Sequence, residues 1–138
     1  MIKALPSLTR PDGRLEISHA TGISVAARDR LERALARINV LVESPDVADL
    51  AAVDSHVVMR ALETIGGVIA GLRIEAEVFP LADGGLAFRW RTVSGLVDVE
   101  FDTEGDDVVL LEDVANGKRK AGYFSEVWAE ALRWLQLS

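Results

Sequence analysis

The sequence has no cysteine and little histidine, and these absences narrow the chemistry that the chain can perform. A chain without cysteine forms no disulfide, has no thiol nucleophile and offers no thiolate to a metal ion. The two histidines, His19 and His56, lie in a predicted connector and near a predicted helix start, and neither belongs to a recognisable catalytic motif. The sequence therefore predicts no catalytic residue, no metal site and no cofactor, and it favours a protein that is not an enzyme.

Long apolar runs and phosphate-binding motifs are also absent. No stretch of about 18 apolar residues is present, so we expect no transmembrane helix and no membrane partner. The segment Met1–Ser7 lacks the apolar core of a secretory signal, which makes the cytoplasm the expected location. The pair Gly66-Gly67 follows no predicted strand and precedes no Lys-Ser or Lys-Thr, so it is not a phosphate loop.

Charge is the clearest compositional signal. The chain carries a net charge of −7, and this charge is unevenly distributed. Residues 1–45 hold seven basic and five acidic side chains, a balance of +2, whereas residues 46–138 hold eight basic and seventeen acidic ones, a balance of −9. An acidic surface repels nucleic-acid phosphates and attracts basic proteins. We therefore expect a basic protein partner and disfavour direct binding to nucleic acid.

Two helices are predicted in the N-terminal half. The first begins at Ser24 or Val25 and ends near Glu43, because apolar residues recur there at helical spacing. The second begins at a cap provided by Asp54 or Ser55 and reaches Gly66-Gly67 or beyond. These glycines end the helix, kink it or allow a close approach by a neighbouring element. Three arginines form a basic stripe on the first helix, which is either a solvated edge or a site for an acidic partner or a phosphate: Arg30, Arg33 and Arg37.

The segments around these helices carry weaker signals. Residues 1–13 contain prolines and a turn and indicate a flexible tail, and residues 14–18 alternate weakly, as in a short edge strand. Ser44-Pro45-Asp46 is a typical helix start, so we expect a short helix that ends near Ala52. A C-terminal amphipathic helix is predicted from a cap at Ser125 to about Leu137.

Residues 73–113 are predicted to form an antiparallel β-meander whose faces follow from residue parity. Side chains alternate between the two faces of a strand, so apolar even-numbered residues on both sides of a hairpin require a loop with an odd number of residues. A three-residue loop over 83–85 satisfies this condition and predicts that Val78 lies opposite Trp90. In the same register, Glu77 lies opposite Arg91.

The next hairpin reverses the parity. The apolar residues become odd-numbered after Ser94-Gly95, which requires a loop with an even number of residues. Ser94-Gly95 is predicted to be this loop, with two residues. Trp90 is then predicted to lie opposite Val99, and Arg91 opposite Asp98. The following run, 108–111, is apolar on both faces, so either a helix or a partner must cover its second face. A fifth strand at 118–123 is left open by the sequence.

Acidic residues concentrate between 98 and 113. Asp102, Glu104 and Asp106 alternate as in a calcium loop, but the glycine that such a loop needs at its sixth position is missing and Asp107 stands there. The flanks also indicate strands, so an acidic hairpin is favoured over a calcium site. We expect a basic partner to contact this band and the apolar residues beside it: Asp98, Glu100, Asp102, Glu104, Asp106, Asp107, Val109 and Leu111.

Two strings in the meander resemble a pattern in small uncharacterised bacterial proteins. These are Pro80–Trp90, in which an Asp-Gly-Gly hairpin leads into an alternating strand that ends in Trp, and the acidic strand Leu96–Asp102. The resemblance covers about a quarter of the chain and carries no catalytic residues. It implies a small accessory or antitoxin-like partner protein.

The sequence thus predicts a single α+β domain over residues 1–138. A helical N-terminal half packs on a four- to five-stranded antiparallel β-meander, and the C-terminal helix closes the domain. The favoured function is a non-catalytic interaction module, an antitoxin-, immunity- or adaptor-like protein that binds a basic partner. One alternative is a ligand-binding or enzymatic module with a cavity between the Gly66-Gly67 helix and the Phe88/Trp90 face. The other is a homodimeric chaperone or scaffold that pairs through residues 108–111 or through the side of the last helix that carries Trp134.

Overall fold

A computed structural model describes residues 8–9, 16–17, 25–43 and 53–137. The expected short helix after Ser44 lies outside these residues. The elements follow one another in the order β1 (Leu8–Thr9), β2 (Glu16–Ile17), α1 (Val25–Glu43), α2 (Ser55–Gly71), β3 (Glu77–Pro80), β4 (Leu86–Arg91), β5 (Leu96–Phe101), β6 (Val108–Asp113), β7 (Lys118–Tyr123) and α3 (Phe124–Gln136). This is the predicted α+β architecture, with two helices before an antiparallel sheet and one after it.

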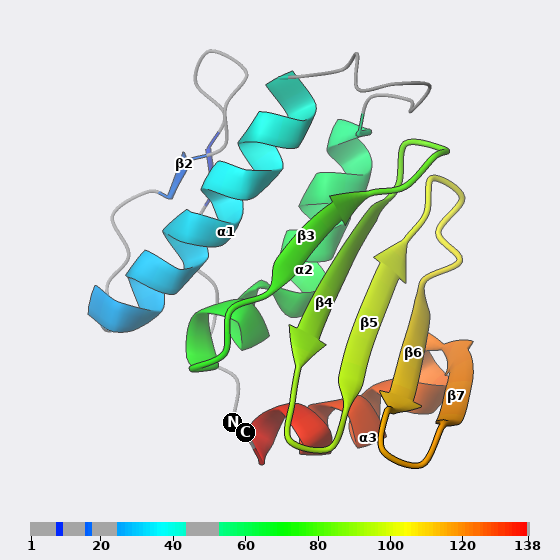
Figure 1. The fold of residues 1–138 in the computed structure, drawn as a ribbon. Coiled ribbons are helices and arrows are strands. Elements are labelled where there is room, and N and C mark those ends of the chain that lie inside the picture. Colours follow the sequence, from blue (N-terminus) through cyan, green and yellow to red (C-terminus); the bar gives the residue numbers. More distant parts are fainter. Residues whose placement is uncertain (1–7, 10–15, 18–24, 44–52, 138) are drawn as a thin grey trace.

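Strands β3 to β7 form one antiparallel sheet in sequence order, which is the full five-stranded meander. Figure 1 shows α2 and α3 behind this sheet, with α3 crossing the strands and α1 lying beside the β3 edge. Near the N-terminus, β1 pairs with β2, so Leu8–Thr9 is a strand within the stretch that was expected to be a flexible tail. The helices therefore cover one face of the sheet, and no described element covers the other.

Helix α2 begins at one of the two predicted caps and continues beyond its internal pair of glycines. Asp54 is the N-cap, and its carboxylate accepts a hydrogen bond of 2.7 Å from the backbone N–H of His56. The backbone N–H of Asp54 donates to the carbonyl of Gly84, which ties the helix start to the β3–β4 loop. The helix continues through Gly66 and Gly67, so these glycines do not end it.

The core lies between the helices and the covered face of the sheet. Its largest members are Trp90, Phe88 and Phe101, all fully buried, and Phe88 lies edge-on to Phe101 with ring centroids 6.1 Å apart. Helix α1 contributes Leu31, Ala34, Leu35 and Ile38, and α3 contributes Val127, Ala131 and Leu135. Both helices therefore bury the apolar stripe that their sequences indicate.

The β3–β4 hairpin has the predicted parity but a different register. Val78 lies opposite Phe88 and Glu77 opposite Arg89, so the predicted pairing of Val78 with Trp90 is wrong by two residues. The loop contains five residues, 81–85, instead of three. Gly84, and not Gly85, has the positive φ, and the Asp83 carboxylate accepts a bond from the N–H of Gly85 at 3.0 Å. The Asp83 side chain thus stabilises a loop that is two residues longer than the three-residue loop predicted from parity.

The β4–β5 hairpin departs from its prediction in the same way. Trp90 lies opposite Val97 and Arg89 opposite Asp98, because the loop contains four residues, 92–95, where two were predicted. The Thr92 hydroxyl accepts bonds from the N–H groups of Ser94 and Gly95, both at 3.1 Å. Gly95 has a φ of +144°, and a Cβ there would collide with the backbone carbonyl of Glu112 on β6. Only glycine fits this position.

The C-terminal helix starts one residue before its predicted cap. Tyr123 is the N-cap residue and makes no side-chain capping bond, so the assignment of Ser125 as the cap is wrong. The backbone N–H of Phe124 donates instead to the carbonyl of Asp107 at 3.0 Å. The fifth strand, β7, leads directly into the helix. Gly122 lies close to Val127, so β7 and the first turn of α3 pack tightly.

Candidate protein-binding face

The face of the sheet opposite α2 and α3, here named the open face, follows from the strand register. Its members alternate along each strand with the residues that point toward the helices, and they meet one another across the strands. They are partly or fully exposed except for Ala87, which is 7% exposed. It consists of Glu77, Phe79, Ala87, Arg89, Arg91, Leu96, Asp98, Glu100, Val108, Leu110, Glu112, Arg119, Ala121 and Tyr123. The open face therefore combines seven apolar or aromatic side chains with seven charged ones.

Six of the seven charges on the open face are joined in three ion pairs. Arg89 makes a two-pronged contact with the carboxylate of Asp98, at 2.7 and 2.8 Å. Arg91 contacts Glu77 at 2.7 Å, on the diagonal between β4 and β3. Arg119 contacts Glu112 at 3.2 Å. These pairs occupy the half of the face that lies toward the β4–β5 loop.

Glu100 is the exception on this face. Its side chain is partly buried, and its carboxylate makes no hydrogen bond or ion pair with any residue that the structure describes. Its cross-strand neighbours are Ala87 and Val108, neither of which offers a side-chain donor. Burial raises the pKa of Glu100, and the negative charges of Asp98 and Asp83 raise it further.

The apolar members of the open face lie on both sides of Glu100. One row across the sheet reads Phe79, Ala87, Glu100, Val108 and Tyr123, with a single charge at its centre. The two end members are aromatic and exposed, Phe79 at 37% and Tyr123 at 58%. The guanidinium of Arg89 lies over the Phe79 ring, 5.5 Å from its centroid.

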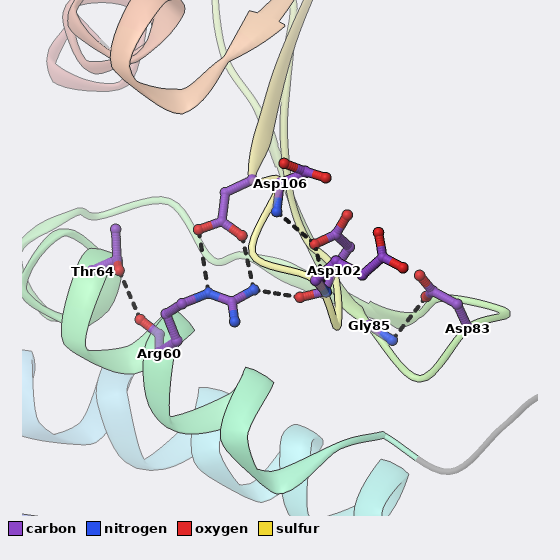
Figure 2. Close-up of polar contacts among 8 residues, drawn as sticks. Arg60, Thr64, Asp83, Gly85, Asp102 and Asp106 are labelled. Carbon is purple, nitrogen blue, oxygen red and sulfur yellow. Dashed lines mark hydrogen bonds and ion pairs between the residues drawn. The ribbon is translucent and has the colours of Figure 1, made fainter.

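The other acidic residues predicted to contact a partner have different surroundings. Asp102 accepts bonds from the backbone N–H groups of Glu104 and Asp106 and so organises the β5–β6 turn. Asp107 binds Arg60 of α2 at 2.9 Å, and Arg60 also donates to the carbonyl of Asp102. Figure 2 shows this turn between Arg60 on one side and Asp83 on the other. Two acidic side chains on the turn remain exposed, those of Glu104 and Asp106.

The two apolar residues in the predicted contact set do not lie at the surface. Val109 is fully buried and Leu111 is 2% exposed, because both point into the core beneath α3. Their neighbours Val108 and Leu110 lie on the open face instead and are partly exposed. Among the described elements, a helix therefore covers only one of the two apolar faces of residues 108–111.

The basic stripe of α1 makes contacts within the chain. Arg30 donates to the carbonyl of Ala70 at 2.9 Å, near the C-terminal end of α2. Arg33 and Arg37 both bind the carboxylate of Glu75, at 2.5 and 2.8 Å. These contacts hold α1 against the connector between α2 and β3, and the hydrogen bonds from Arg37 and Arg33 lower the pKa of Glu75.

Residues for metal or acid–base chemistry are dispersed in the described part of the chain. His56 is exposed in the first turn of α2, and His19 lies outside the described residues. No group of three or more His, Asp or Glu side chains in the described ranges is arranged to hold a metal ion. Phe88 and Trp90, which were considered as a cavity wall, are fully buried members of the core.

Comparison with known proteins gives no relatives: no family model matches the chain, and no curated protein or solved structure does so. None of the helices in the described ranges combines the length and the apolar character needed to cross a membrane. The open face is therefore interpreted from its own residues.

Proposed function

We propose that this protein is a non-catalytic interaction module that binds a basic protein partner through the open face. It would act as an accessory protein of the antitoxin or immunity type, in the cytoplasm. The observation that supports this proposal is the open face itself, which no described element covers and which holds partly exposed apolar residues such as Leu96, Val108 and Leu110. Apolar side chains that meet across neighbouring strands on an uncovered face are typical of an interaction site.

The sign of the charge favours a basic partner. The open face carries four acidic and three basic side chains, and the three basic ones are already in ion pairs. The acidic side chains of Glu104 and Asp106 lie nearby on the β5–β6 turn, and the whole chain has a net charge of −7. Such a field accelerates encounter with positively charged proteins.

The test is affinity capture from cells of origin at low salt, with three forms of the chain immobilised side by side. The wild type should retain a basic protein in stoichiometric amount and release it at about 1 M salt, where charges are screened within about 3 Å. Leu110→Lys, in the middle of the open face, should lose the partner. Val114→Lys makes the same chemical change at an exposed position in the β6–β7 turn and should keep it.

Two results would overturn the proposal. One is equal capture by the Leu110→Lys and Val114→Lys variants, which would place the partner elsewhere. The other is an empty column for the wild type. Light scattering on the purified chain tests the alternative that the protein is a homodimer. A second copy bound to the open face would give a dimer, which Leu110→Lys would convert to a monomer.

A further inference from the structure

The position of Glu100 suggests which chemistry the open face recognises, and this step rests on the proposed function. Glu100 lies on β5, the central strand of the sheet, in a row whose other members are apolar or aromatic. An ionised carboxylate that loses part of its hydration without gaining a partner is unfavourable. Every other charged side chain on the open face has a partner within the described residues. Among the described residues, Glu100 is therefore the one charged side chain of the open face without a partner, and a ligand cation would fit there.

A second copy of this chain does not supply that cation from the same face. The arginines of the open face, Arg89, Arg91 and Arg119, are held by Asp98, Glu77 and Glu112. A face-to-face dimer would have to break one of these pairs to neutralise Glu100. A partner with an unpaired lysine or arginine neutralises it without breaking any of them.

The spacing of the row limits the shape of the partner segment. Neighbouring strands lie about 4.8 Å apart, so Ala87 and Val108 are about 5 Å from Glu100 along the row, and Phe79 and Tyr123 about 10 Å. In an α-helix, residues three or four apart are separated by about 5 Å along the axis, and residues seven apart by about 10.5 Å. A helix laid across the strands therefore matches the row residue by residue. Helix α3 already crosses β5, β6 and β7 in this way on the covered face (Figure 1).

We propose that the open face binds an amphipathic helix of the partner that carries one lysine or arginine in the middle of its apolar stripe. The cation contacts Glu100. Apolar side chains three or four positions away contact Val108 on one side and lie over Ala87, which is 7% exposed, on the other. Those seven positions away contact Phe79 and Tyr123. Glu100 supplies specificity for the cation, and the two aromatic side chains supply apolar contact area at the ends.

The probe is a synthetic amphipathic helix of about 17 residues with apolar residues at these spacings and arginine at its centre. Two further peptides replace the central arginine by citrulline, which has nearly the same shape without the charge, and by glutamate. Binding is measured by fluorescence anisotropy at low salt. The wild-type chain should bind the arginine peptide at least about tenfold more tightly than the citrulline peptide, as expected for a partly desolvated charge pair.

Variants of the chain locate the effect. Glu100→Gln should remove the preference for arginine over citrulline, and Glu100→Lys should bind the glutamate peptide in preference to the arginine peptide. Glu104→Gln makes the same charge change on the exposed β5–β6 turn and should keep the arginine preference. Thermal unfolding of each variant shows that it is folded.

The outcomes separate this inference from the proposed function. Equal affinity for the arginine and citrulline peptides, or no binding of either, overturns the helix proposal. If Leu110→Lys still abolishes capture of the cellular partner in that case, the open face is the binding site, but it recognises other chemistry. If the Glu100 variants invert peptide preference as stated, the assignment of Glu100 stands even when capture from cells fails.

Discussion

At the scale of single residues, we expect Glu100, the residue proposed to contact the cation of a partner, to weaken the folded state of the free chain. A carboxylate between Ala87 and Val108 forgoes the apolar cross-strand contacts that valine would make there. We predict that Glu100→Val raises the free energy of unfolding by about 0.5–1 kcal/mol at pH 7. A residue whose replacement raises stability is often one that is retained for function.

The pH dependence of this gain follows from the raised pKa of Glu100. Between the unfolded pKa, about 4.3, and the higher folded pKa, the folded state binds more protons, so the wild type loses stability as the pH rises through this window. The advantage of Glu100→Val should therefore be smaller at pH 4 than at pH 7 in urea unfolding. Glu104→Val, on the exposed turn, should change stability by less than about 0.5 kcal/mol. A gain that is equal at both pH values would contradict this account.

Glu75 has the opposite pH behaviour. Its pKa is lowered by the hydrogen bonds from Arg37 and Arg33, so its contribution to stability is present above the unfolded pKa, about 4.3, and is lost as the pH falls through the lower folded pKa. The melting temperature of Glu75→Gln should therefore fall below that of the wild type at pH 7, and the difference should shrink as the pH falls through the lowered pKa of Glu75. In an Arg33→Gln/Arg37→Gln background, the substitution should have little effect at any pH.

At the scale of elements, the register of β4 and β5 can be tested through the directly opposed pair Arg89 and Asp98. Arg89→Glu places like charges opposite each other and close to Glu77, so it should destabilise the chain by about 1 kcal/mol. Adding Asp98→Arg restores an opposite-charge pair and should recover at least half of the loss. The measurement is a double-mutant cycle from urea unfolding.

A second cycle with Arg91→Glu and Asp98→Arg is the matched control. These residues would be directly opposite if the β4–β5 loop had only two residues, whereas Arg91 lies opposite Leu96 in the structure. The coupling between Arg91 and Asp98 should therefore be clearly smaller than that between Arg89 and Asp98. A larger coupling for Arg91 would favour the shorter loop.

The two hairpins also show what the sequence can and cannot predict about the fold. Alternation along each strand assigns Phe88 and Trp90 to the buried face correctly, because the period of a strand is two and does not depend on the loop. The number of residues in the loop decides which residues lie opposite each other. Parity shows only whether this number is odd or even, so loops that differ by two residues satisfy it equally well. The Thr92 hydroxyl and the Asp83 carboxylate stabilise loops two residues longer than the shortest ones. Such local hydrogen bonds to side chains leave no periodic pattern in the sequence, so they could not be predicted from it.

The candidate site was predictable only as a band of acidic residues. Spacing alone does not separate Asp98, Glu100 and Asp107, since all three are acids near a hairpin. The difference lies in their partners: Arg89 binds the first, Arg60 binds the third, and Glu100 has none in the described part of the chain. Arg60 is 47 positions from Asp107, so this pair could be found only in three dimensions. Pairing, and not sequence, identifies Glu100 as the distinctive acid.

At the scale of the whole molecule, Arg60 links α2 to the β5–β6 turn and, through that turn, to the start of α3. Its guanidinium reaches from α2 to the carbonyl of Asp102 (Figure 2). It also reaches both carboxylate oxygens of Asp107, at 2.9 and 3.3 Å. The carbonyl of Asp107 in turn accepts the bond from the first N–H of α3, that of Phe124. One side chain thus fixes the β5–β6 turn against α2 and, through Asp107, positions the start of α3.

We predict that Arg60→Ala lowers the free energy of unfolding by about 1.5–3 kcal/mol, because it leaves the partly buried carboxylate of Asp107 without its cation. Arg60→Lys keeps the charge but cannot span both Asp107 oxygens and the Asp102 carbonyl, so it should recover less than half of the loss. Arg28→Ala removes an exposed pair with Glu32 on α1 and should change stability by about 0.5 kcal/mol or less. Hydrogen exchange should show increased opening of the β5–β6 turn and the first turn of α3 together in Arg60→Ala. Opening of the turn alone would mean that α3 is positioned independently of Asp107.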